Sequence, residues 1–149
     1  MVSVNAVDLI PHALPMRMID EIVSFDDSLK SSVSEATVRF SFPFLDDDGD
    51  LLHSAYLELI AQASAAQHGF NLQRNGLSEE DGFLVGVRNL TIHSTAHIGD
   101  ILTIHIQLGT EIDALSVVAG AVFCSQTLLA EAEITVWHGV NVGAPTEFF

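Results

Sequence analysis

The 149-residue sequence has one cysteine and few basic residues: it contains five lysines and arginines but 20 aspartates and glutamates. Cys124 has no second cysteine to pair with inside the chain, which excludes an intramolecular disulfide and fits a reducing cytoplasm. A net charge of −15 argues against nucleic acid and an anionic membrane surface as partners, because both bind basic surfaces. No apolar run reaches the ~18 residues of a transmembrane helix. The first ten residues have no basic region, so no signal peptide is expected.

No repeat, low-complexity tract or linker divides the chain. A single domain is therefore expected over residues 1–149, with its core over about 8–137 and a loose tail over 138–149. Apolar and branched residues bounded by turn signals predict six strands, over 16–25, 32–42, 83–92, 101–108, 115–124 and 128–137. In the second of these, Ala36, Val38 and Phe40 alternate with polar residues at the period of a strand.

Between the second and third strands, residues 51–73 are predicted to form one long helix that stops near Asn75 and Gly76. The acidic stretch 46–50 is expected to cap its first turn. One face of the helix carries Leu52, Ala55, Leu59, Ala63, Ala66 and Phe70, and the other faces carry Leu57, Ile60, Ala61 and Ala65. A helix that is apolar nearly all round is buried.

One buried helix after two strands and before four more indicates an α+β domain. Because a single helix cannot cover both faces of a long sheet, the simplest arrangement is a curved antiparallel sheet of about six strands wrapped around the helix. Such a sheet has open edges, which dimerisation covers. A dimer or a multiple of one is therefore expected.

Three motifs occur in an order and spacing that resemble the β-hydroxyacyl-ACP dehydratases, over roughly residues 8–137. Residues 10–20 read IPHALPMRMID, residues 57–63 read LELIAQA, and residues 83–90 read FLVGVRNL, with Gly99 and Asp100 marking the next turn. The chain most resembles the dehydratase-like proteins of aryl-polyene gene clusters, which share the Pro-Phe-Leu-Asp segment at 43–46. The resemblance implies a hot-dog fold and action on acyl thioesters carried by acyl carrier protein or coenzyme A.

The sequence departs from this family at one important position. The standard dehydratases carry a catalytic histidine 14 residues before the helix glutamate, and counting back 14 residues from Glu58 reaches Phe44. The glycine at the start of the family's helix, whose amide polarises the thioester carbonyl, falls at His53. The sequence therefore supports the acyl-thioester fold better than it supports the dehydratase reaction.

Three residues are candidates for catalysis. Glu58 lies in the middle of an apolar helix, where a lone carboxylate is costly to ionise, so it either acts in a site or is satisfied by backbone or by another subunit. The resemblance allows His12 to act as the base that removes the α-proton while Glu58 handles the β-hydroxyl; a structural role in the proline-rich turn is equally open. His53, near the helix start, is expected to face the partner chain or the substrate mouth, and the alternative is a polar residue that only starts the helix.

Four residues are candidates for substrate binding. Gln62 is one helical turn after Glu58 and shares its face, so it either orients the carboxyl group or binds the substrate. Val85, Gly86 and Val87 are expected to line an acyl tunnel, with Gly86 allowing the closest approach. The alternative for Gly86 is a glycine needed only for packing of the helix on the sheet.

The favoured function is reversible dehydration of a 3-hydroxyacyl thioester on acyl carrier protein or coenzyme A. Two alternatives remain open: thioester hydrolysis with Glu58 activating water, and a catalytically inactive hot-dog subunit that binds acyl chains or completes a heterodimer with an active paralogue. No metal or organic cofactor is expected, because the thioester itself acidifies the α-proton, no two histidines form a His-x-x-x-His pair on the predicted helix, and Cys124 has no cysteine partner.

Overall fold

The computed structural model describes residues 3–10, 16–78 and 80–139. Within these residues the chain forms one α-helix, one 3-10 helix and seven strands. In chain order they are β1 (Val4–Asn5), η1 (Ala6–Asp8), β2 (Glu21–Asp26), β3 (Ser31–Thr37), α1 (His53–Arg74), β4 (Asp81–Ile92), β5 (Ile101–Ile112), β6 (Leu115–Cys124) and β7 (Thr127–Gly139).

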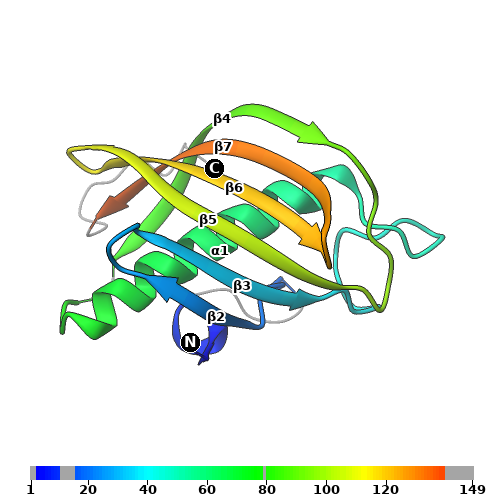
Figure 1. Ribbon diagram of the computed structural model, residues 1–149, viewed down its shortest axis with the longest axis horizontal. Helices are drawn as coiled ribbons and strands as arrows, with labels where there is room; N and C mark the ends of the chain where they lie inside the picture. Colours follow the sequence, from blue (N-terminus) through cyan, green and yellow to red (C-terminus); the bar gives the residue numbers. More distant parts are fainter. Residues whose placement is uncertain (1–2, 11–15, 79, 140–149) are drawn as a thin grey trace.

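The strands form one antiparallel sheet in the order β1-β2-β3-β5-β6-β7-β4, which is open, with β1 and β4 at its edges. The sheet curves around α1, which lies along its concave side (Figure 1). The predicted α+β architecture, a long central helix wrapped by a curved antiparallel sheet, is confirmed. The strand beyond the expected six is the two-residue β1.

The bounds of the elements differ from the predicted ones mainly where the chain enters or leaves the sheet. The predicted strand over 16–25 begins only at Glu21, because the preceding residues bond to the helix instead of to a neighbouring strand. β3 ends at Thr37, and the amide of Phe42 closes a turn onto the carbonyl of Arg39. β7 includes 138 and 139, the first two residues of the expected tail, and residues 140–149 lie outside the described part.

The acidic stretch does not cap α1 as predicted. Leu52 is the N-cap residue, no side chain caps the helix, and its first turn contains no acidic residue. Asp46 instead closes its own loop, because its Oδ1 accepts hydrogen bonds from the amides of Asp48 and Asp50 at 2.9 Å each. Asp50 pairs with His97 on the loop before β5. The start of the helix therefore keeps its amides free of side-chain caps.

Packing of α1 against the sheet depends on one close approach. A Cβ atom on Gly120 of β6 would lie 2.4 Å from Cγ2 of Ile60, closer than real Cβ contacts come. Ile60 is completely buried, so it has no room to move away. Gly120 therefore sets how near the centre of the sheet comes to the helix.

We predict that Gly120→Ala destabilises the protein by about 1–3 kcal/mol, the usual cost of overpacking a core. Gly86→Ala is the matched control, because its Cβ would make ordinary contact with Thr135 at 3.7 Å. Urea unfolding of both variants measures the difference. Equal stability of the two would contradict the packing argument.

Candidate functional site

Glu58 is half-buried and lies in the N-terminal half of α1. Its Oε1 accepts a hydrogen bond of 2.9 Å from Nε2 of Gln62, one turn later. The expectation that these two residues share a face of the helix is confirmed. They are the two predicted site residues that the structure brings together.

Gln62 is completely buried and also joins the helix to the segment before β2. Its Oε1 accepts from the amide of Met18 at 2.8 Å and from the amide of Ile19 at 3.4 Å. Its Nε2 donates to the carbonyl of Met16 at 2.8 Å as well as to Glu58. We call residues 16–19 the lead-in segment. Buried backbone groups must find partners, and in this segment a helix side chain supplies them.

The two candidate histidines differ in what the structure describes of them. His12 lies outside the described part of the chain. His53 is the first residue of α1, and its side chain is exposed. At position 44, where the standard dehydratases have their histidine, Phe44 is half-buried and packs against the core. The roles of His12 and His53 therefore stay predictions.

Val85, Gly86 and Val87 lie on β4 at the edge of the sheet. Val85 and Val87 are 36% and 41% exposed. Val87 pairs with the buried Ile134, whereas Gly86 pairs with Thr135. Paired residues share a face and neighbours along a strand alternate faces, so Val87 lies on the helix side and Gly86 on the outer side. Nothing but the side chain of Thr135 would lie within 4 Å of a Cβ at Gly86, so the glycine is not needed for packing on the helix.

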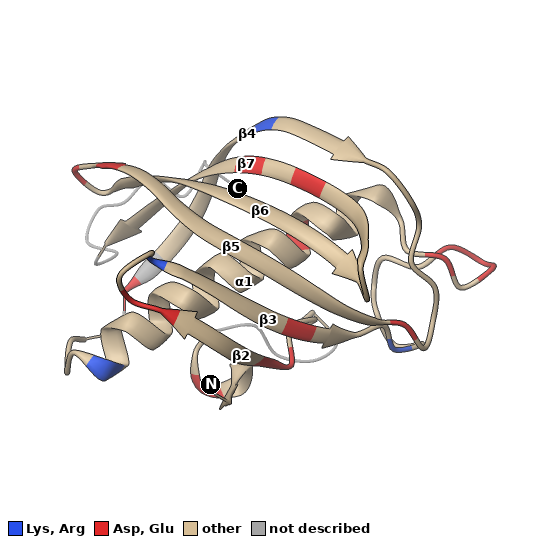
Figure 2. Ribbon diagram, in the orientation of Figure 1, with Lys and Arg blue, Asp and Glu red and all other residues tan. Residues whose placement is uncertain are grey.

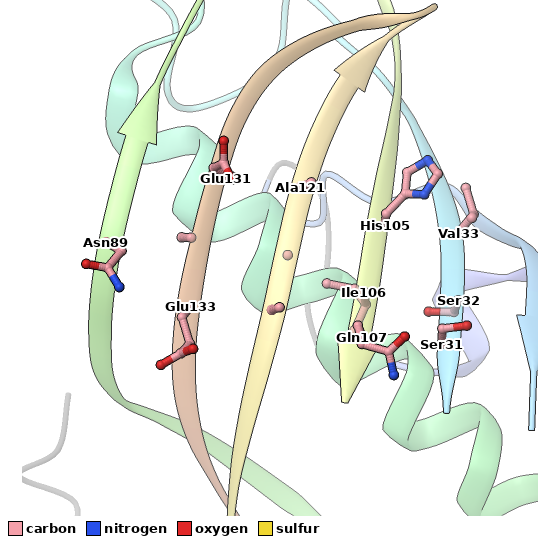
Figure 3. Close-up of a pocket in the computed structure, with 13 residues that line it drawn as sticks. Ser31, Ser32, Val33, Asn89, His105, Ile106, Gln107, Ala121, Glu131 and Glu133 are labelled. Atoms are coloured by element: carbon pink, nitrogen blue, oxygen red, sulfur yellow. The ribbon is translucent and has the colours of Figure 1, made fainter. Parts of the chain in front are cut away.

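A hollow of about 530 Å³ lies on the outer face of the sheet, away from the helix (Figure 3). β6 contributes the small residues Ala119, Gly120 and Ala121 to its lining. Ala121 lies between the taller side chains of His105 on β5 and Glu131 on β7 (Figure 3). None of the predicted site residues within the described part of the chain lines the hollow. The hollow follows from the small side chains of β6 and does not form part of the site at Glu58.

A second hollow of about 340 Å³ lies between the C-terminal half of α1 and the sheet. Two histidines in its lining stack on each other: the rings of His68 and His138 lie 3.8 Å apart, and His68 pairs with Glu80 at 2.7 Å. Burial, and then the neighbouring His68, lowers the pKa of His138 to about 4.

His138 falls in the predicted loose tail, but in the structure it lies in β7. The sequence contains a signal for this position. The residues at 130, 132, 134 and 136, which are buried in β7, alternate with a period of two that continues to 138.

Across residues 3–10, 16–78 and 80–139, no group of three or more histidine, cysteine or acidic side chains has the geometry of a metal site. The same residues contain no helix with the length and apolar character needed to cross a membrane.

Comparison with known proteins gives concordant results. The profile of the ApeP-like family, described as ApeP dehydratase, matches residues 4–146. The 3-hydroxyacyl-[acyl-carrier-protein] dehydratase FabZ of Xanthomonas oryzae pv. oryzae is 27% identical over 142 residues, which cover 89% of this chain and 90% of that protein. The FabZ of Xylella fastidiosa is 25% identical over 130 residues, covering 85% of this chain and 81% of that protein.

Two solved structures illustrate the fold. The dehydratase heterocomplex ApeI:P from Xenorhabdus doucetiae contains a chain that superimposes with a TM-score of 0.84 at 21% identity, covering 93% of both chains. A probable thioesterase from Bartonella henselae superimposes with a TM-score of 0.58 at 16% identity, covering 73% of this chain and 90% of that one. The predicted hot-dog fold is confirmed.

We predict that His138 weakens the fold in acid. With a pKa of about 4 against an ordinary 6.5, His138 stays neutral in the folded protein while the unfolded chain takes up a proton. Stability should therefore fall as the pH drops from 6.5 towards 4, by up to about 3 kcal/mol. His138→Phe should flatten this loss, measured by urea unfolding at each pH.

His97 is the control, because the hydrogen bond that its ring donates to Asp50 raises its pKa. Its contribution is fully present below the ordinary pKa and is lost as the pH rises through the raised one. Removing it should therefore change the pH dependence in the opposite sense. An unchanged pH profile in His138→Phe would contradict the prediction.

Proposed function

This chain belongs to the ApeP-like dehydratase family, and from that membership we propose that it works in the dehydration of 3-hydroxyacyl chains held as thioesters on acyl carrier protein or coenzyme A. The observation that carries the proposal is the half-buried carboxyl group of Glu58, held within an apolar helix by a buried glutamine. It is supported by FabZ relatives, whose names state dehydration of a 3-hydroxyacyl group on acyl carrier protein.

In this reaction a base removes a proton from C2, the electron pair forms the C2–C3 double bond, and the C3 hydroxyl leaves as water. Glu58 is the group proposed to protonate the leaving hydroxyl. The amides of the first turn of α1, which no side chain caps, are proposed to polarise the thioester carbonyl. From His53 to Glu58 the helix rises by about 7.5 Å, so one acyl thioester reaches both.

The base has to come from a position other than 44, because Phe44 has no group that accepts a proton. We propose His12 or a histidine of a second subunit for this role. The name of the ApeI:P heterocomplex states that a dehydratase of this kind is built from two different chains. By analogy, this chain works as one half of a pair, with either a paralogue or a second copy.

The edge strand β4 is the proposed contact with the second subunit. In the described part of the chain β4 pairs with β7 alone. Val85, Val87 and Leu90 on it are 36%, 41% and 38% exposed. An apolar sheet edge of this kind is covered in stable proteins, and pairing with a second chain covers it.

The acidic charge of this chain is a second reason to propose a partner subunit, which would dock the anionic acyl carrier. The few lysines and arginines are scattered among the acidic residues (Figure 2). Four of the five are paired with acids, as Lys30–Glu111, Arg39–Asp20, Arg74–Asp27 and Arg88–Glu133. A carrier with phosphate and acidic groups therefore finds little attraction on this chain, and the proposal assigns the basic docking surface to the partner.

Replacing Glu58 by glutamine tests the reaction. Glu58→Gln keeps the shape of the side chain but removes the transferable proton, so hydration of a crotonyl thioester should slow by at least ~10²-fold while the protein stays folded. Loss of the enoyl absorbance measures hydration, and a thiol reagent measures hydrolysis in the same samples. Glu133→Gln, the same change on the outer face of the sheet, is the matched control and should leave the rate unchanged.

The assay also separates the alternatives. Release of free thiol by the wild type, with no hydration, would replace the dehydratase proposal by a thioesterase. A wild type that is inert alone and across several chain lengths, but active after addition of its paralogue, would show that the chain is an accessory half of the enzyme.

The chain alone at micromolar concentration should scatter light as a dimer or a multiple of one. Val87→Asp should lower the measured mass towards that of the monomer, because a charge on β4 disfavours pairing of the edge. A wild type with the monomer mass would contradict self-association and leave the heterodimer to be tested by mixing with a paralogue.

A further inference from the structure

We propose that Gln62 is a positioning residue, which orients the Glu58 carboxyl group by tying it to the lead-in segment. This inference rests on the proposed function of Glu58. It departs from the expectation that Gln62 binds substrate, and the hydrogen bonds around its amide group decide between the two roles.

The amide group of Gln62 has only one orientation that satisfies its neighbours. The amides of Met18 and Ile19 are donors, so the atom that faces them is the oxygen. The NH₂ group then faces the carbonyl of Met16 and the carboxyl group of Glu58, and one hydrogen goes to each. The backbone of the lead-in segment therefore determines that Gln62 presents a donor, and not an acceptor, to Glu58.

The same hydrogen bonds leave Gln62 nothing with which to bind a substrate. Both hydrogens of Nε2 are donated within the chain, and Oε1 accepts from two amides. The side chain is completely buried, so a substrate reaches it only after the lead-in segment separates from the helix. Gln62 therefore acts on the substrate through Glu58.

The orientation of the Glu58 carboxyl group depends on the lead-in segment, which is distant from it in sequence. The carboxyl group of an exposed glutamate rotates freely, whereas here one oxygen is held by a side chain that is itself anchored to the lead-in segment. A displacement of about 1 Å in a catalytic group costs as much as ~10²-fold in rate. Loss of the Gln62 donor should therefore lower kcat while leaving KM nearly unchanged.

The helix contains a matched control. Gln67 is also a buried glutamine of α1, and it also ties the helix to another segment, because its Oε1 accepts from Ser32 Oγ at 2.5 Å and its Nε2 donates to the carbonyl of Lys30 at 3.0 Å. None of these hydrogen bonds involves Glu58. Gln62 and Gln67 therefore play the same structural role, and they differ in their contact with the carboxyl group.

The kinetic test compares Gln62→Glu with Gln67→Glu. In Gln62→Glu the oxygen facing Met18 is kept, but the group facing Glu58 becomes a second carboxyl oxygen. We expect kcat for crotonyl thioester hydration to fall at least ~10-fold with KM within about 3-fold. Gln67→Glu should lose stability to urea but keep kcat within about 2-fold. Equal losses of kcat in the two variants would overturn the positioning role.

A spectroscopic test decides the question without activity. In protein labelled with ¹³C-glutamate, the side-chain carboxyl resonance of Glu58 is the one that disappears in Glu58→Gln. It should shift in Gln62→Met and stay in place in Gln67→Met. If it does not move in Gln62→Met, the proposal is wrong whatever the enzyme assay shows, whereas an inert wild type with a shifted resonance would refute the proposed reaction and keep the contact.

The reciprocal measurement covers the case in which Gln62 variants do not fold. In ¹⁵N-labelled Glu58→Gln, the side-chain amide resonances of Gln62 should move and those of Gln67 should not. Unchanged Gln62 resonances would overturn the proposal.

Discussion

A helix without a polar face is the constraint on which the rest of this structure depends. Leu59, Ile60 and Ala63 of α1 are completely buried, and Leu57, Ala61 and Ala65 on the other side are still half-buried. Such a helix cannot lie on the surface of a flat sheet, because much of its apolar surface would remain in water. The sheet therefore curves around it, and Gly120 allows the strand at the centre of the curve to approach closely.

Burying a helix on nearly all sides has a second consequence, for its polar residues. Each polar side chain in it has to find partners in the surrounding chain, since unsatisfied polar groups are costly in a core. Tyr56 accepts from the amide of Ala96, Gln67 bonds to the start of β3, and Gln62 bonds to the lead-in segment. Tyr56 and Gln62 thus fix segments that lie outside the sheet, and Gln67 fixes the start of β3. Glu58 is the carboxylate of the helix, and it takes part in this network through Gln62.

The sequence was sufficient to predict the helix, the main strands in their order along the chain, and a sheet that wraps around the helix. These features follow from apolar periodicity over long segments. The sequence was not sufficient at positions where hydrogen bonds between residues far apart in the chain decide the structure. The lead-in segment 16–19 has the apolar composition of a strand, yet it bonds to Gln62, 44 residues from Met18, which composition does not show. Acidic residues before a helix usually cap it, but Asp46 forms its own turn and Asp50 pairs with His97 instead.

The candidate site was predictable to the same extent. The pairing of Glu58 with Gln62 follows from helical spacing alone, whereas the face on which Gly86 lies depends on a β-bulge in β4, between Leu84 and Gly86. One extra residue in a strand moves the following side chains to the other face of the sheet. The three residues 85–87 therefore cannot line one tunnel as a uniform strip: Val87 lies towards the helix and Gly86 away from it. Of the three residues, Val87 is the one whose side chain lies on the helix side of β4 while staying 41% exposed.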